Sequence, residues 1–199
     1  LTGVKKVGHS GTLDPFATGV LLVFIGREAT KHISKFIGLE KEYYAKIKLG
    51  KKTDTADLTG KVIEEKFIPE LSISQIESVF QNFIGRIQQI PPMYSAVKKN
   101  GVRLYKLARK GETIEREPRA VEIKELRLQK YEKPFLEFSA IVSKGTYIRT
   151  LAEDIAEKLG TVGHLVKLRR MRIGDFHIKD AVKLVELDRE TCLLYTSPS

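Results

Sequence analysis

Alternating apolar and polar positions predict most of the strands in this chain. In residues 41–50 (KEYYAKIKLG), an apolar or aromatic residue occupies every second position from Tyr43 onward, and lysines fall between them. Successive side chains of a strand point to opposite faces, so this pattern indicates one buried and one basic face. Similar patterns predict strands at 120–131, 134–145 and 164–176. The short apolar run GVLLVFIG at 19–26 is typical of a buried strand.

Apolar residues three and four positions apart predict helices between these strands. One helix is predicted over 27–38, one over 72–85 and one over 146–160, each followed or closed by a glycine. Ser74 and Glu77 fit a capping box at the start of the second helix. The segment KKTDTADLTG between the strand at 41–50 and the second helix is predicted to be a polar loop, because its Asp and Thr residues favour local turns.

The order of these elements indicates the fold class. Strands and helices mix without the regular period of βαβ units, so we expect an α+β fold with a mixed, largely antiparallel sheet and flanking helices. The length of 199 residues with 42% hydrophobic residues suits one domain, assigned to 1–191. We expect this domain to be N-terminally incomplete, because the chain opens beside its most informative motif. Residues 192–199 (CLLYTSPS) continue no pattern and are interpreted as a foreign or disordered tail.

Composition narrows the class of partner. The net charge of +10 in a folded chain favours a polyanion, the alternative being a merely lysine-rich surface. No apolar run approaches the roughly 18 residues of a membrane span, so no membrane partner is expected. The single Cys192 fits a reducing, cytoplasmic setting. The four histidines are scattered without zinc-ligand spacing, so no metal is expected.

The stretch VGHSGTLDPFATG contains the strongest candidate for chemistry. Asp14 is the only acid between Leu1 and Arg27. Pro15 disfavours a helical conformation at Asp14, and the flanking glycines let the backbone turn tightly or approach a ligand. A carboxylate held in this way can act as a nucleophile, a general base or a metal ligand. The alternative is an acid that only stabilises a turn.

A second motif, KGTYIR at 144–149, offers partners for such a carboxylate. Arg149 can clamp a carboxylate through two hydrogen bonds. Tyr147 and Tyr43 are aromatic residues among cations, an arrangement that suits an unstacked nucleobase. Taken singly, the tyrosines are more readily interpreted as residues at the edge of the core, and Arg149 as a surface charge at a helix start.

Two basic segments strengthen the case for a nucleic acid over a solvated surface. A short basic helix follows a Pro-Pro break, with Leu104, Leu107 and Ala108 on its inner face. The segment 98–119 around it holds eight basic residues against three acids, namely Lys98, Lys99, Arg103, Lys106, Arg109, Lys110, Arg116 and Arg119. The segment HLVKLRRMRIG adds Lys167, Arg169, Arg170 and Arg172 without an acid.

Five blocks of the sequence resemble one enzyme family in order and spacing. They are KKVGHSGTLDPFATGVLLVFIGREATK, KEYYAKIKLGKKTDTADLTG, PPMYSAVKKNGVRLYKLARKG, SKGTYIRTLAEDIAEKLG and HLVKLRRMRIG. Together they resemble the TruB-type tRNA pseudouridine synthases over roughly residues 4–187. The bacterial type is more similar than the archaeal and eukaryotic relatives that work with guide RNAs.

This resemblance implies a pseudouridine synthase fold and the conversion of uridine 55 in the T loop of tRNA to pseudouridine, without cofactor or metal. It implies that Asp14 is the catalytic aspartate and Arg149 its partner. It further implies that Tyr43 stacks on the flipped base and is a candidate for proton abstraction. His9, Tyr147 and Leu168 are implied to bind the substrate, and the family's RNA-gripping region matches Lys98, Arg103, Lys106 and Arg109. The partner is then the T stem-loop of tRNA, and we expect a cytoplasmic monomer.

Two further hypotheses stay open. The first is a guide-RNA-dependent synthase that acts on ribosomal RNA. The second is an inert RNA-binding or RNA-folding module on the same scaffold. The family also has an N-terminal strand with a Lys-Pro motif and further C-terminal sequence, which we do not find here.

Overall fold

A computed structural model describes residues 2–95, 97–99, 101–108, 111–112 and 114–187. Its centre is a mixed, largely antiparallel sheet, which confirms the predicted α+β class. In spatial order the path runs through β13 (Phe176–His177), β12 (Gly163–Ile173), β4 (Lys41–Leu49), β11 (Phe135–Val142), β10 (Arg119–Glu132) and β7 (Gly85–Gln89). A two-residue strand, β2 (Thr18–Gly19), pairs with β12 in parallel.

The strands predicted from alternation are present at the centre of this sheet. In β4, every second residue from Lys41 to Leu49 is buried, as the pattern requires. This strand pairs antiparallel with β11 on one side and with β12 on the other, so Tyr43 lies opposite both Ala140 and Arg170. Because β4 is central, the direction of its side chains decides which residues reach the core.

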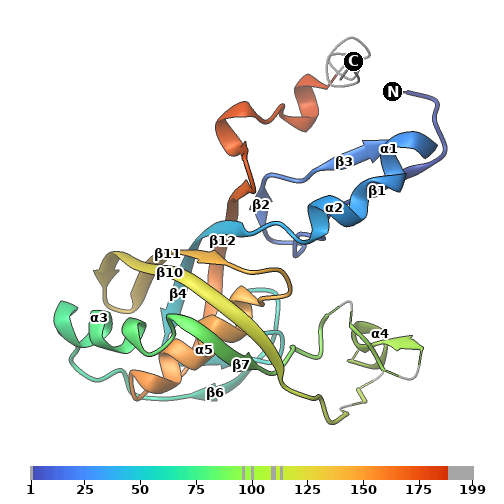
Figure 1. The fold of residues 1–199 in the computed structure, drawn as a ribbon. Helices are drawn as coiled ribbons and strands as arrows, with labels where there is room; N and C mark the ends of the chain where they lie inside the picture. Colours follow the sequence, from blue (N-terminus) through green and yellow to red (C-terminus); the bar gives the residue numbers. More distant parts are fainter. Residues whose placement is uncertain (1, 96, 100, 109–110, 113, 188–199) are drawn as a thin grey trace.

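Two helices cover one face of the sheet (Figure 1). They are α3 (Ile73–Gln81) and α5 (Ile148–Lys158). The apolar stripe of α5, which includes Leu151 and Ile155, is completely buried against the inward residues of the strands. Phe80 of α3 contacts Phe138 of β11 edge-on, with 6.1 Å between the ring centroids. This packed layer fixes the start of α5, which is where the site residues lie.

The start of α3 differs from the prediction. The capping box is formed by Ser72 and Gln75, not by Ser74 and Glu77. The Ser72 hydroxyl accepts a hydrogen bond from the Gln75 amide, and the Gln75 side chain accepts one from the Ser72 amide. Ser72 has an extended backbone, as a helix cap requires, whereas Ser74 is already inside the helix.

The N-terminal part departs most from the predictions. The run 19–26 is split between β2 and β3 (Val23–Ile25), and Val23 is 51% exposed. Within the described residues β3 pairs only with β1 (Val7–His9), and a two-stranded ribbon cannot bury both of its faces. The helix predicted over 27–38 is interrupted at His32 into α1 (Arg27–Lys31) and α2 (Ile33–Ile37).

Two hairpins lie at the margins of the sheet. The predicted polar loop begins as β5 (Lys51–Thr53), which pairs with β6 (Val62–Glu65), and the residues between them fold back until Asp57 bridges to Leu165 of β12. In the second hairpin, β8 (Lys98–Lys99) pairs with β9 (Val102–Arg103). It leads into the predicted short helix α4 (Leu104–Ala108), and this unit projects from the sheet (Figure 1).

Two other observations concern membrane-spanning helices and the predicted C-terminal tail. In the part of the chain that the structure describes, no helix is long and apolar enough to cross a bilayer. The predicted tail at 192–199 lies outside the described residues.

The loop that carries Asp14 is anchored by its own backbone to β12. The Val20 amide donates to the Arg170 carbonyl over 2.9 Å. Gly19 has φ +111°, and a Cβ placed there would lie 2.1 Å from the Arg170 carbonyl oxygen. Only glycine permits this close approach. Phe16 and Ala17 also pack against the hydrophobic core, so both backbone and apolar contacts hold the loop.

We therefore expect Gly19→Ala to detach the loop from β12. The new methyl group clashes with backbone atoms and the conformation is strained, so the free energy of unfolding should fall by about 2–4 kcal/mol. The matched control is Gly38→Ala, where φ is −71° and no atom lies within 4 Å of the added Cβ. Urea denaturation of both variants checks this expectation. Equal stability of the two would show that the close approach at Gly19 is not needed.

Candidate active site

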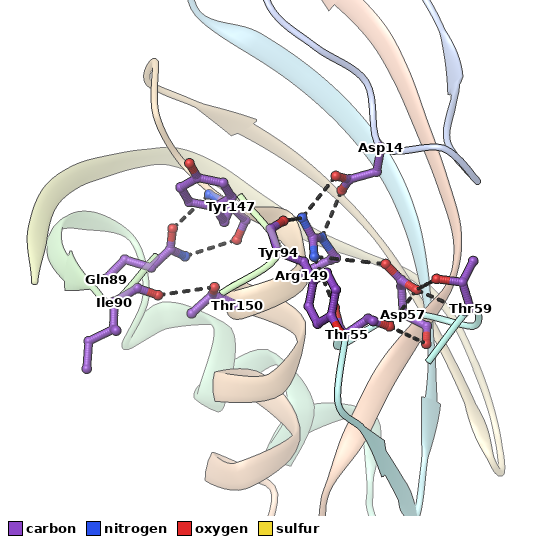
Figure 2. Close-up of polar contacts among 10 residues, drawn as sticks. All are labelled: Asp14, Thr55, Asp57, Thr59, Gln89, Ile90, Tyr94, Tyr147, Arg149 and Thr150. Carbon is purple, nitrogen blue, oxygen red and sulfur yellow. Dashed lines mark hydrogen bonds and ion pairs between the residues drawn. The ribbon is translucent and has the colours of Figure 1, made fainter. Parts of the chain in front are cut away.

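Asp14 and Arg149 form a two-point ion pair at the centre of the candidate site (Figure 2). Arg149 Nε donates to Asp14 Oδ2 and Nη2 donates to Asp14 Oδ1, each over 2.9 Å. The pairing joins the N-terminal loop to the first turn of α5, 135 positions apart in sequence. Paired parallel hydrogen bonds fix the orientation of the carboxylate as well as its position.

The Arg149 guanidinium has two further acceptors. Nη1 donates to the Thr55 carbonyl over 3.0 Å, and Nη2 also donates to the Tyr94 carbonyl over 2.7 Å. Arg149 is 4% exposed, whereas 29% of the Asp14 side chain remains accessible. The cation is therefore locked inside the protein, while the carboxylate that it holds presents part of its surface to an incoming molecule.

A second carboxylate, Asp57, lies on the far side of the same arginine. Its Oδ2 is 3.9 Å from Arg149 Nη1, and its other oxygen accepts from the Thr55 hydroxyl and from the amide and hydroxyl of Thr59 (Figure 2). Sequence reasoning missed Asp57, because an acid within a Thr-rich loop resembles a turn residue. One guanidinium thus serves two carboxylates, of which only Asp14 is partly exposed.

Tyr147 is positioned through its backbone. It precedes α5 in an extended conformation, and its amide and carbonyl form a reciprocal pair of hydrogen bonds with the buried side chain of Gln89, over 2.7 and 3.1 Å (Figure 2). The Tyr147 side chain is half-buried. Because its backbone is fixed, the ring has a defined place beside the start of α5.

Tyr43 and Leu168 are buried, with 8% and 5% of their surface exposed. They come from neighbouring strands, and both belong to the hydrophobic core. Burial raises the pKa of the Tyr43 phenol, the negative charge of Asp14 adds to this, and the nearby positive Arg170 opposes it. The phenol is therefore protonated at neutral pH. The structure brings Tyr43 into the electrostatic field of Asp14.

Two buried cations in this region were not predicted. Arg170 is 1% exposed and Lys41 is 7% exposed. Arg170 therefore does not belong to the predicted basic surface of HLVKLRRMRIG, and Arg172 is paired with Glu40 and Glu42 over 2.8 and 3.2 Å. A signal was available, because both buried cations occupy inward-facing positions of their strands, in phase with apolar residues.

The other predicted residues either have no described contact with the ion pair or lie outside the described residues. His9 is exposed at the end of β1, where its Nδ1 accepts from the Gly11 amide over 3.3 Å. The backbone places Lys98 in β8, Arg103 in β9 and Lys106 in α4. Arg109 lies outside the described residues. Among the residues that the structure describes, no three His, Cys, Asp or Glu side chains are grouped to hold a metal ion.

Family models match nearly the whole chain. Residues 1–148 match the N-terminal domain of the TruB family pseudouridylate synthases. The chain belongs to this family. Residues 149–196 match the tRNA pseudouridylate synthase B C-terminal domain. The boundary between the two models falls between Ile148 and Arg149, inside α5, so Asp14 and Arg149 come from different family segments.

Curated members of the TruB family are similar over most of the chain. The tRNA pseudouridine synthase B of Psychrobacter cryohalolentis is 45% identical over 196 residues, which cover 96% of this chain and 54% of the relative. That of Geotalea uraniireducens is 49% identical over 184 residues, covering 92% of this chain and 59% of the relative. The chain thus spans somewhat more than half the length of these relatives.

Solved structures with a similar fold include more distant proteins. The crystal structure of a Cbf5–Nop10–Gar1 complex matches with a TM-score of 0.65 and 30% identity, covering 87% of this chain and 42% of that chain. An H/ACA RNP bound to a substrate RNA that contains 2′-deoxyuridine matches with a TM-score of 0.61 and 26% identity, covering 87% and 40%. These likenesses agree with the predicted pseudouridine synthase fold.

The buried Lys41 gives the TruB-family site a testable pH dependence. Its amine donates to the carbonyls of Ile37 and Leu39, and burial, together with the charges of Arg170 and Lys144, lowers its pKa from 10.5 to about 8. Between these values the unfolded chain keeps a proton that the folded chain has released. The unfolded state then binds more protons, so stability rises with pH in this window.

We therefore expect the free energy of unfolding of the wild type to rise relative to Lys41→Met by about 2 kcal/mol between roughly pH 7 and pH 9.5. Denaturant titrations at the two pH values measure the difference, in which the other titrating groups cancel. The exposed Lys35→Met variant serves as the control and should follow the wild type. A constant difference between wild type and Lys41→Met would mean that the amine titrates normally.

Proposed function

We propose that this protein is the catalytic part of a tRNA pseudouridine synthase that isomerises uridine 55 in the T loop. The observation that carries the proposal is the two-point contact between Asp14 and the buried Arg149. The chain that contains this ion pair is 45–49% identical to proteins named tRNA pseudouridine synthase B. Support for a tRNA substrate comes from these names and from the net charge of +10.

The reaction requires one bond to be exchanged for another within the same nucleotide. The bond between C1′ of the ribose and N1 of uracil breaks, the free base turns, and C1′ bonds to C5. The proton on C5 is then lost, and N1 ends protonated, so the atoms balance without an added oxidant or reductant. Because the target base is stacked within the T loop, it must first be flipped out.

Asp14 is suited to act at the anomeric centre. It is held by Arg149, and part of its surface is accessible. An ionised carboxylate in this place either attacks C1′, attacks the base, or assists elimination to a glycal. All three routes need a fixed carboxylate beside the flipped nucleotide, and the ion pair supplies this while part of the carboxylate surface stays accessible.

The surrounding residues retain the base while it is free. We assign Tyr43 and Tyr147 to stacking and Leu168 to the apolar wall of the pocket, because a water-poor site prevents the detached uracil from escaping. Tyr43 is also the candidate for removing the C5 proton. Its phenol is protonated at rest, so it can take the C5 proton only after passing its own proton on, for which N1 of the detached uracil is the acceptor. The positive charge of Arg170 favours the phenolate that forms in between.

A second candidate is a synthase that works within a ribonucleoprotein on another RNA. The structural likeness to the Cbf5–Nop10–Gar1 complex and to an H/ACA RNP favours this reading. Their identity of 26–30% is well below the 45–49% found for the tRNA pseudouridine synthase B proteins. Pseudouridine formation in a T stem-loop transcript, with no other protein or RNA present, separates the two candidates.

We expect Asp14→Asn to lower the single-turnover rate of pseudouridine formation by at least about 10⁴, because the nucleophile is removed while the shape is kept. Binding to the same transcript should persist, since phosphate contacts supply most of the affinity. The matched control is Asp175→Asn, which neutralises an exposed acid in the turn after β12. A wild-type rate in the Asp14→Asn variant would return Asp14 to the role of a turn acid, whereas no pseudouridine formation by the wild type itself would favour the inert RNA-binding module.

Tyr43→Phe separates stacking from proton transfer. The ring is retained, so affinity for the transcript should change little, whereas turnover should fall by roughly 10²–10⁴ if the hydroxyl moves a proton. Tyr131→Phe, in β10, controls for the loss of a phenol elsewhere in the sheet. Single-turnover kinetics at saturating protein measure both variants. A near-normal rate for Tyr43→Phe would exclude the hydroxyl from the chemistry.

A further inference from the structure

The second buried arginine, Arg170, has a different environment from Arg149. It is the largest of the fully buried side chains, with 1% of its surface exposed. Its Nε donates to the Val20 carbonyl over 2.7 Å and its Nη2 to the Gly11 carbonyl over 3.0 Å. Its described hydrogen-bond partners are therefore backbone carbonyls rather than carboxylates. A buried cation without an acidic partner is costly, which calls for a reason beyond packing.

The two carbonyls lie on opposite sides of Asp14 in the sequence. Gly11 comes three residues before Asp14 and Val20 six residues after it. The guanidinium thus spans the base of the loop and holds its two ends together. The backbone of Arg170 adds to this, since its carbonyl accepts from the Val20 amide and the residue pairs with Gly19 in the parallel ladder. One residue of β12 therefore fixes both ends of the Asp14 loop.

The same guanidinium also reaches the second reactive side chain. Tyr43 is directly opposite Arg170 in the pairing of β4 with β12, and the positive charge of the guanidinium lowers the pKa of its phenol against the effect of burial. The planar group, with its rigid fork of donors, holds the two carbonyls in one fixed arrangement, and its strand places it opposite Tyr43. The position of Asp14 relative to Tyr43 is thereby defined by a single side chain that touches neither the carboxylate nor, in our assignment, the substrate.

We propose that Arg170 is a positioning residue that sets the Asp14 loop against Tyr43, in the site assigned above to pseudouridine formation. This inference rests on the proposed function. Arg149 orients the carboxylate, and Arg170 determines where the loop that carries it is placed. The positive charge of Arg170 also favours the phenolate form of Tyr43 over the neutral form.

The first test compares Arg170→Met with Arg170→Lys. Methionine fills space without donors, and lysine keeps the charge but lacks the planar fork that bridges both carbonyls. In single-turnover assays with a T stem-loop transcript, we expect Arg170→Met to lose at least about 10²-fold in rate, with affinity for the transcript within about threefold of wild type. Arg170→Lys should recover part of the rate. The control is Leu136→Val, a core variant in β11 chosen to lower thermal stability without contacting the loop.

The second test needs no activity. The amides of Ser10 and Ala17 are hydrogen bonded within the loop region, to Leu22 and Asp14. In Arg170→Met and Arg170→Lys, their hydrogen exchange should accelerate at least about tenfold relative to Leu136→Val, because the loop opens locally. The Tyr43 phenol should titrate at a higher pH in Arg170→Met but not in Arg170→Lys, since only the former loses the positive charge. Spectrophotometric titration against the matching Tyr43→Phe double variants isolates this phenol.

The outcomes separate the inference from the function on which it rests. Failure of the wild type to form pseudouridine overturns the proposed function, and loop exchange then still decides whether Arg170 fixes the loop. A normal rate in Arg170→Met, or equal loss in Arg170→Met and Leu136→Val, overturns the positioning role. So does unchanged exchange at Ser10 and Ala17. Loss of rate with accelerated exchange, and partial rescue by lysine, supports it.

Discussion

The hydrogen-bonded ion pair of Asp14 and Arg149 is the constraint on which the rest of this site depends. It joins a loop at one end of the chain to a helix in the second half, and each partner needs its own support. Arg149 is held by the packed layer of α5 and by the carbonyls of Thr55 and Tyr94. The Asp14 loop is held by β12. The sheet and its helices therefore serve to bring two independently anchored backbones within hydrogen-bonding distance.

The sequence predicted the elements whose burial is decided locally. Strand β4 and helix α5 each show a clear period, and both are present where the pattern placed them. The prediction of one buried strand at 19–26 was wrong. The exposure of this run depends on which strands pair with β3, and no local sequence pattern specifies that pairing. Ser72 and Ser74 fit a capping box equally well by spacing, and only the backbone conformation of Ser72 decides between them.

The arrangement of the site residues was less predictable from the sequence than the fold was. Composition and spacing singled out Asp14 and offered Arg149 as a possible clamp for a carboxylate, but only the family resemblance implied that these two residues pair across 135 positions. Arg170 was interpreted as a surface cation because a sum of charges ignores the direction of side chains. The alternation of β12 held the information that corrects this, since Leu168 and Arg170 share the inward parity. The position of a basic residue in phase with the apolar residues of a strand therefore indicates a buried cation, which the summed charge of the segment cannot indicate.

The charges around the site explain why two buried arginines are needed rather than one. Asp14 and Asp57 together bring two negative charges to Arg149, which alone cannot balance them. Arg170 adds a buried positive charge beside the loop, as Lys41 does, and its hydrogen bonds go to neutral carbonyls, which leaves the Asp14 oxygens free of a second strong donor. If Arg170 contacted Asp14 directly, more of the carboxylate would be occupied and a nucleophile would be weakened. Because Arg170 binds the loop backbone instead, the carboxylate keeps a fixed position, nearby positive charge offsets its negative charge, and one side of it stays accessible.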